Sequence, residues 1–341
     1  MKGMIFMQSS NSPIIPTSAE SPPGMKTLYA DRSGSHSVSY IPDIVYDTRA
    51  GLPLHLQMLY PSPQPMGLMM KIMREQNPER FPPEDKSKKS EATSPPPMPQ
   101  TKHPLVVYVQ GSAWGKQDCK RSLPNLVEIA RQGYAIASVE YRPSNVAPWP
   151  GFLCDVKAAI RYLRQNAELF GIDPARIAVW GDSSGGHTAL LVGSTGWTKE
   201  FDDGLCSDQS SAVSAAISFY GLSDISKIND VPRNPMYVNS PENMVPENIL
   251  LRTNTAEHPE ACAPANPINY IHKDKNYPPF LLLHGDEDDM VPFNQSVLMY
   301  NKLVETEKQV DFYKVKGAGH GRHFWTKEVL ETVIQFLRAY V

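Results

Sequence analysis

The sequence has few cysteines, and none of them lies in a paired motif. Its 341 residues include four cysteines, and no two of these have the CxxC spacing of a metal or redox site. This scarcity excludes a small protein held together by disulfide bonds, so the expected state is scattered free thiols. The four are Cys119, Cys154, Cys206 and Cys262.

Neither sign of charge is in excess. Lys and Arg together number 33 against 36 for Asp and Glu, which gives a formal net charge of -3 at pH 7. A protein that binds nucleic acid through its phosphates carries a clear basic surplus. The sequence therefore predicts no nucleic-acid partner.

Long apolar runs are also missing. The amino-terminal apolar run covers only residues 4–7, whereas a signal peptide needs about 7 to 15 apolar residues and a membrane helix about 20. We therefore expect no membrane span and a cytoplasmic location, or secretion if translation starts upstream of Met1. Nothing in the composition indicates an oligomeric state.

Proline divides the chain into regions. Of the 32 prolines, 17 fall in the first 104 residues. Residues 1–36 have no strand or helix period and are expected to be a disordered tail. Residues 37–341 are expected to form the main folded domain, interrupted by a polar, Pro-rich insertion at 61–103. A second Pro-rich connection, at 225–277, is either a cap that shapes a substrate pocket or an irregular surface segment.

Apolar runs typical of strands alternate with stretches of helical period through the rest of the chain. This alternation predicts the α/β class, with a mostly parallel sheet that has helices on both faces and binds ligands at the carboxyl ends of its strands. The helices are expected at 152–170, at 188–192 and near the carboxyl terminus. The strands are expected at 41–47, 52–60, 104–109, 134–141, 176–180, 215–220, 280–284 and 310–315.

A G-x-S-x-G motif follows one of these strands directly. Residues 181–187 read Gly-Asp-Ser-Ser-Gly-Gly-His and precede a helical run. A strand that turns straight into a helix lifts the central serine clear of the backbone, and the positions two before and two after it are too crowded for side chains. Gly181 and Gly185 satisfy this requirement for Ser183, which is the predicted nucleophile; Ser184 would place Asp182 at a crowded position. A structural or phosphate-binding turn is the alternative.

A serine nucleophile needs a base to remove its proton. In this architecture the order along the chain is serine, acid, histidine, which leaves the histidines after the last expected strand. His320, flanked by Gly319 and Gly321, is the predicted base, and His323 is the reserve candidate. His187 is expected to pack against the sheet.

The acid is expected in a loop after a strand and before His320. Residues 286–289 offer four carboxylates after the strand at 280–284. We assign Asp288, with Asp286 as the alternative, to accept the imidazole N–H and to stabilise the imidazolium.

The oxyanion site needs N–H donors near the carbonyl oxygen. The loop after the strand at 104–109 reads Gln-Gly-Ser-Ala-Trp-Gly over residues 110–115. We expect the amides of Ser112 and Ala113 to act together with the amide of Ser184. Trp114 either forms a wall of the acyl pocket, as a substrate-binding residue, or staples the loop.

Together these motifs resemble the α/β-hydrolase fold over roughly residues 38–341. Within this fold the chain is similar to the hormone-sensitive-lipase-like carboxylesterases and to the related acetylxylan and feruloyl esterases, the BD-FAE-like family. The resemblance rests on residues 181–186, on His284-Gly285-x-x-Asp288-x-x-Val291-Pro292, on residues 319–321 and on Glu-Tyr-Arg-Pro at 140–143. The family's loop is typically His-Gly-Gly-Gly followed by an aromatic residue. The variant at 110–114 resembles that of some esterases of plant cell-wall acyl groups.

The sequence thus predicts a serine carboxylesterase without metal or cofactor, for short acyl or aryl esters such as acetyl or feruloyl esters of plant carbohydrate. Its partner would be this small-molecule or carbohydrate ester. A prolyl-oligopeptidase-like peptidase and a non-catalytic ligand receptor of the same fold are the alternatives. A metallohydrolase is a weaker one, since the nine histidines show no HExxH spacing.

Overall fold

The computed structural model describes residues 37–49, 51–61, 102–230 and 241–341, together with the isolated Lys26, Met70, Arg74 and Glu79. The chain divides into Met1–Ser33 and a compact unit, Gly34–Val341, and the account below concerns the second unit. Apart from Lys26, the predicted tail at 1–36 lies outside the described residues, as does most of the predicted insertion at 61–103. Both therefore stay predictions.

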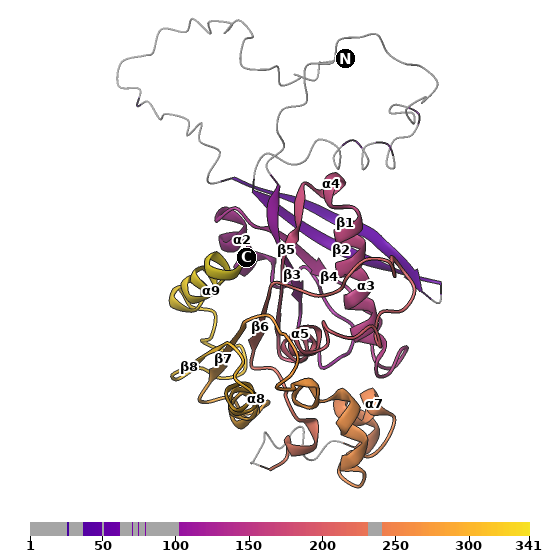
Figure 1. Ribbon diagram of the computed structural model, residues 1–341, viewed down its shortest axis with the longest axis vertical. Helices are drawn as coiled ribbons and strands as arrows, with labels where there is room; N and C mark the ends of the chain where they lie inside the picture. The colour runs from indigo at the N-terminus through magenta and orange to yellow at the C-terminus, as the bar shows by residue number, and fades with distance from the viewer. Residues whose placement is uncertain are drawn as a thin grey trace, which may run out of the picture. The chain divides into compact units, whose positions relative to one another are not determined.

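An eight-stranded sheet forms the centre of this unit (Figure 1). Its strand order is β1-β2-β4-β3-β5-β6-β7-β8. The pairs β1–β2 and β2–β4 are antiparallel, and the others are parallel, which confirms the predicted fold class. The strands are β1 Val38–Arg49, β2 Leu52–Pro61, β3 His103–Val109, β4 Ala135–Val139, β5 Ile172–Asp182, β6 Ala215–Phe219, β7 Phe280–Gly285 and β8 Val310–Val315.

The central strands are buried on both faces. Along β3, Leu105, Val107 and Val109 belong to one hydrophobic cluster, whereas Val106 and Tyr108 belong to another. Successive side chains of a strand point to opposite faces, so a continuous apolar run fits a strand covered on both sides. This explains why the strand at 104–109 shows no polar alternation in the sequence.

Helices cover both faces of the sheet (Figure 1). On one face, α3 (Gly151–Gln165), α5 (Ser184–Ser194) and α8 (Asn294–Glu305) contribute to the first cluster. On the other, α2 (Leu123–Arg131) and α9 (Lys327–Tyr340) contribute to the second. The helix expected at 152–170 is broken at Asn166, which separates α3 from the short α4 (Ala167–Phe170). Gly171 ends α4 in the left-handed conformation, with φ 58°.

The connection between β6 and β7 consists of short helical turns. Residues 231–240 within it lie outside the described part of the chain. Leu250, Cys262 and Ala265 from this connection are buried in the same cluster as α5. The connection therefore packs on the domain, on the α5 face. Its helical turns are η1 Ile225–Lys227, η2 Glu242–Met244, α7 Pro246–Leu251, η3 Pro259–Ala265 and η4 Pro267–Tyr270.

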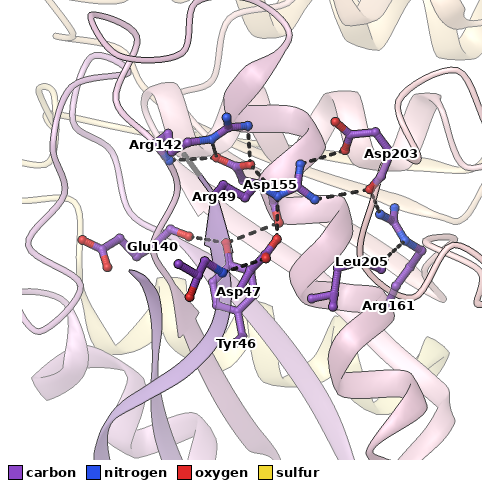
Figure 2. Close-up of polar contacts among 10 residues, drawn as sticks. Tyr46, Asp47, Arg49, Glu140, Arg142, Asp155, Arg161, Asp203 and Leu205 are labelled. Carbon is purple, nitrogen blue, oxygen red and sulfur yellow. Dashed lines mark hydrogen bonds and ion pairs between the residues drawn. The ribbon is translucent and has the colours of Figure 1, made fainter. Parts of the chain in front are cut away.

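A cluster of charged side chains joins the β1–β2 hairpin to α3 (Figure 2). Asp155 of α3 is fully buried and accepts hydrogen bonds from Arg142 Nε at 2.9 Å and Nη2 at 2.8 Å. Arg49 of β1 lies 3.5 Å from Asp155 and 2.9 Å from Asp203. Arg161 of α3 donates to the carbonyl of Asp203 at 2.6 Å. We call this set the hairpin clamp, because it holds β1, α3 and residues 202–205 together.

Two expectations from composition can be compared directly with the structure. All four cysteines are unpaired, which confirms the expected free thiols. Across the described ranges, no helix combines the length and the apolar character needed to cross a bilayer.

Candidate active site

The turn between β5 and α5 presents Ser183. Its backbone is strained, with φ 55° and ψ -124°, a region that residues with a Cβ rarely adopt. A Cβ added to Gly181 would lie 2.2 Å from the Gly185 carbonyl oxygen, and one added to Gly185 would lie 1.9 Å from the Val109 carbonyl oxygen. The two flanking positions therefore admit only glycine. This is the crowding that the G-x-S-x-G motif predicts around a nucleophilic serine.

Loops after β7 and β8 bring the expected acid and base to Ser183. His320 Nε2 lies 2.9 Å from Ser183 Oγ, and His320 Nδ1 lies 2.8 Å from Asp288 Oδ2. Since a carboxylate only accepts, Nδ1 carries the proton and Nε2 is free to accept the Ser183 O–H. The imidazole also packs on Tyr220, with ring centroids 4.7 Å apart. The structure thus brings together the three residues assigned as a triad from the sequence.

Asp288 is held in place by more than His320. Its Oδ1 accepts the amides of Met290 and Val291, each at 2.9 Å, and His284 Nε2 lies 3.4 Å from Oδ2. Burial acts to raise the pKa of Asp288, but its hydrogen bonds and charge interactions with His284 and His320 outweigh burial and hold it well below its ordinary value. Asp288 is therefore ionised at neutral pH and can stabilise an imidazolium on His320.

The alternative candidates take other positions. Asp286 Oδ1 accepts the Gly317 amide at 2.6 Å and so holds the loop that carries His320. His323 is exposed, and none of the hydrogen bonds among the described residues joins its ring to Ser183 or Asp288. The geometry favours Asp288 and His320 over both.

The loop after β3 lies against Ser183. Its Gly111 amide donates to Asp182 Oδ1 at 2.9 Å, and a Cβ on Gly111 would lie 2.7 Å from the Cβ of Ser183. Two successive residues, Ala113 and Trp114, have positive φ values of 51° and 55°. Such strain persists only where surrounding contacts hold it, and it is common at functional sites.

One of the expected oxyanion donors has a partner within the protein. The Ser112 amide donates to Ser184 Oγ at 2.9 Å, so the expectation that it is free for a substrate oxygen does not hold in this conformation. The Ser184 side chain, whose amide alone was expected to matter, therefore competes as an acceptor. Within the described part of the chain, the amides of Ala113 and Ser184 donate to no acceptor, and they remain the candidate pair.

Trp114 is part of the core and not a pocket wall. It is 2% exposed, and its indole N–H donates to His187 Nδ1 at 3.1 Å. His187 Nε2 in turn lies 2.7 Å from the Ala265 carbonyl oxygen of η3, to which it donates. Burial lowers the pKa of His187 to about 4, so the ring is neutral at pH 7. The substrate-binding role expected for Trp114 is therefore wrong: it staples the loop through the buried His187.

Asp182 is a site residue that sequence reasoning missed. Its Oδ1 also accepts the Tyr108 hydroxyl at 2.6 Å, so β3, the loop after it and the nucleophile turn meet on one carboxylate. Burial raises its pKa, against the lowering effect of these hydrogen bonds. A carboxylate placed beside the nucleophile in the motif was the available signal. Among the residues that the structure describes, no group of three or more His, Cys, Asp or Glu side chains has the arrangement of a metal site.

Comparison with known families matches residues 94–303, more than half of the chain, to the family described as BD-FAE. The chain belongs to the BD-FAE family. Among proteins similar to this BD-FAE chain is Esterase LipC of Mycobacterium tuberculosis, 32% identical over 227 residues that cover 66% of this chain and 54% of LipC. Esterase LipQ of the same organism is 32% identical over 203 residues, 58% of this chain and 45% of LipQ. The BD-FAE chain spans about half the length of these relatives.

Solved structures share the fold over most of the chain. A truncated carbohydrate esterase from gut microbiota aligns with a TM-score of 0.69 at 25% identity, over 90% of this chain and 97% of that one. A butyrate-bound esterase, Est2 of Thermogutta terrifontis, aligns with a TM-score of 0.62 at 21% identity, over 87% of this chain and 93% of that one. These likenesses confirm the α/β-hydrolase fold.

Proposed function

We propose that this BD-FAE protein is a serine carboxylesterase that works through an acyl-enzyme. The observation that carries the proposal is the continuous chain from Ser183 Oγ through His320 to Asp288, with hydrogen-bond distances of 2.9 and 2.8 Å. Nucleophile, base and orienting carboxylate are the elements that acyl transfer by a serine requires. The esterases LipC and LipQ support the same class of reaction.

In the first half-reaction, Ser183 Oγ attacks the ester carbonyl while its proton passes to His320 Nε2. Asp288 stabilises the resulting imidazolium through Nδ1–H. The negative oxygen of the tetrahedral intermediate accepts hydrogen bonds from the Ala113 and Ser184 amides. His320 then returns the proton to the leaving alcohol, and the acyl group stays on Ser183.

In the second half-reaction, water replaces the alcohol. His320 takes a proton from water, and the oxygen attacks the acyl-enzyme carbonyl. The tetrahedral intermediate collapses when His320 protonates Ser183 Oγ, which releases the carboxylic acid and restores the starting enzyme. No proton is left over, because His320 gains and returns one in each half.

The proposed substrates are esters with short acyl or aryl acid groups, acetyl and feruloyl esters of carbohydrate among them. The likeness to a carbohydrate esterase from gut microbiota over 97% of that chain favours a carbohydrate alcohol. The sequence variant at residues 110–114 points the same way.

Hydrolysis of p-nitrophenyl acetate, butyrate and octanoate, methyl ferulate and acetylated xylan tests the proposal. Ser183→Ala should lower kcat by a factor on the order of 10⁶, because the acyl acceptor is removed. The variant should retain its thermal unfolding temperature, and only the wild type should react with a fluorophosphonate. Near wild-type turnover by the variant would refute the assignment of Ser183.

The same panel separates the two alternatives. Faster release of an arylamide than of the matched ester would indicate a serine peptidase. If the wild-type protein hydrolyses none of the esters and does not react with a fluorophosphonate, a ligand receptor is indicated.

A further inference from the structure

A cavity lies close to the oxyanion loop. Its volume is about 530 Å³, within the range of small-molecule sites. One wall comes from the loop after β4 and the opposite wall from η2, α7 and the turn after α7. Its lining residues are Ser144, Asn145, Glu242, Asn248, Ile249, Arg252, Thr253 and Asn254. None of them belongs to the triad.

The cavity is joined to the oxyanion loop by the backbone. The Ser144 amide donates to the Trp114 carbonyl oxygen at 2.8 Å, one residue after the oxyanion donor Ala113. The Trp149 amide donates to the Leu250 carbonyl oxygen at 3.0 Å, which ties the loop after β4 to α7. Both walls are therefore fixed relative to the oxyanion donors.

The α7 wall is preformed. Asn248 Oδ1 accepts the amide and the hydroxyl of Thr255 at 2.9 and 2.8 Å, and its Nδ2 donates to the Glu242 carbonyl oxygen at 3.1 Å. These three bonds connect η2, α7 and the turn that follows. Arg252 ends α7 in the left-handed conformation, with φ 53°, and the Thr253 amide returns to the Asn248 carbonyl oxygen at 3.3 Å. A preformed wall reduces the ordering that a ligand would otherwise have to impose.

The lining has the chemistry of a site for hydroxyl groups. Of the described residues that line the cavity, all but Ile249 have polar or charged side chains, which can make hydrogen bonds. Arg252 offers donors, Glu242 offers acceptors, and Asn145 offers both. Within the described ranges, no hydrogen bond or ion pair commits the side chains of these three residues to another residue. A cation and an anion in one cavity favour a neutral ligand over a phosphate or an ammonium group, each of which would meet one like charge.

From these observations we infer that the cavity binds the carbohydrate portion of the ester, the alcohol that leaves in the first half-reaction. The inference deepens the proposed function and rests on it. Arg252 and Asn145 donate to sugar hydroxyls, and Glu242 accepts from them.

Two acetate esters that differ only in their alcohol provide the test. In acetylated xylobiose the leaving group is a hydroxyl of the disaccharide. In p-nitrophenyl acetate the leaving group is p-nitrophenol, which contains no sugar. For Arg252→Ala and Asn145→Ala, we expect kcat/KM for acetylated xylobiose to fall about tenfold each, mainly through KM, because each variant loses hydrogen bonds from bound sugar. Turnover of p-nitrophenyl acetate should stay at the wild-type value. Arg131→Ala is the matched control, since Arg131 is an exposed arginine of α2, on the opposite face of the sheet.

Several results would overturn the inference. One is that kcat/KM falls equally for both acetates in the variants, and another is that it falls for neither. A third is that the wild-type protein hydrolyses p-nitrophenyl acetate but no sugar acetate. A selective loss on p-nitrophenyl octanoate would also overturn it, because it would place the acyl chain in this cavity.

A binding measurement separates this inference from the proposed function. Xylobiose binding to Ser183→Ala, followed by calorimetry, requires no turnover. Addition of Arg252→Ala should weaken it about tenfold, the effect of a lost charged hydrogen bond. If wild type hydrolyses neither acetate but Arg252→Ala still weakens xylobiose binding, the esterase proposal fails and the cavity assignment stands. If xylobiose does not bind, or binds both proteins equally, the cavity assignment fails.

Discussion

The triad and the hairpin clamp each surround a buried carboxylate, Asp288 in the first and Asp155 in the second, but their protons and charges are arranged differently. In the triad, one carboxylate faces two imidazoles, and the chain of hydrogen bonds ends at the hydroxyl of Ser183. In the hairpin clamp, Asp155 faces the guanidinium groups of Arg142 and Arg49. An imidazole gains or loses a proton near neutral pH, whereas a guanidinium does not. Only the first cluster can therefore move a proton.

The two clusters also differ in what they connect. The triad gathers side chains from three loops at the carboxyl ends of strands. The clamp joins β1 to α3, and the Tyr46 hydroxyl reinforces it by donating to the Glu140 carbonyl oxygen at 2.7 Å (Figure 2). Burial of charge alone is thus no sign of catalysis. What distinguishes the catalytic cluster is a titratable group between a carboxylate and a nucleophile.

Asp288→Asn should cause the largest loss of kcat among the substitutions below, because it changes the carboxylate of the triad. The amide cannot hold the His320 tautomer, and the corresponding change in a well-studied triad lowers kcat by about 10⁴. The protein should remain folded, because the clamp is untouched. Asp286→Asn is the matched control and should keep nearly full kcat on p-nitrophenyl acetate. If Asp286→Asn is the more damaging of the two, the acid is misassigned.

Asp155→Ala should disrupt the hairpin clamp and lower the stability of the protein. It leaves Arg142 and Arg49 without their buried counter-charge, so we expect the free energy of unfolding to fall by about 3 to 5 kcal/mol. The folded fraction should keep its kcat. Urea unfolding and activity per folded molecule measure the two effects. As a control, Asp173→Ala removes an exposed pair with Arg176 and should change stability by about 1 kcal/mol or less. An equally small effect of Asp155→Ala would contradict the clamp's structural role.

The buried His187 should make the stability of the protein depend on pH. Its pKa is about 4 in the folded protein against an ordinary 6.5. Between these values the unfolded state binds more protons, so stability falls as pH drops from 6.5 to 4, by about 3 kcal/mol in all. Asp288, whose pKa is lowered, loses its contribution only below about pH 3.9.

Urea unfolding across this pH range checks the effect of His187. His187→Gln cannot titrate, and the slope between pH 6.5 and 4 should flatten. An unchanged slope would assign the pH dependence to another group.

Ser184→Ala should give the smallest effect. It removes the acceptor of the Ser112 amide and loosens the strained loop, so kcat/KM should fall between about twofold and tenfold, the worth of one hydrogen bond. Ser194→Ala, at the far end of α5, is the matched control. A faster Ser184→Ala enzyme would show instead that the hydroxyl competes with the substrate oxygen for the Ser112 amide.

Local motifs explain why so much of the site was predictable. Residues 181–186 dictate their own turn, since only glycine fits beside Ser183. Asp288 and His320 each lie in a short loop after a strand whose apolar run is visible in the sequence. Their order along the chain then determines which loops meet, because the carboxyl ends of neighbouring parallel strands lie at one edge of the sheet. The catalytic roles themselves remain predictions for the variants above to test.

The α/β class, the eight strands and the residues that meet at Ser183 could be predicted from the sequence, because periodicity and turn chemistry are local properties. Only the tertiary structure decided that Trp114 is buried on His187, that the Ser112 amide faces Ser184 Oγ, and that Arg142 serves the clamp. Each of these outcomes depends on a partner brought close by folding. An aromatic, an amide or an arginine has several possible partners in the unfolded chain, and packing selects one of them.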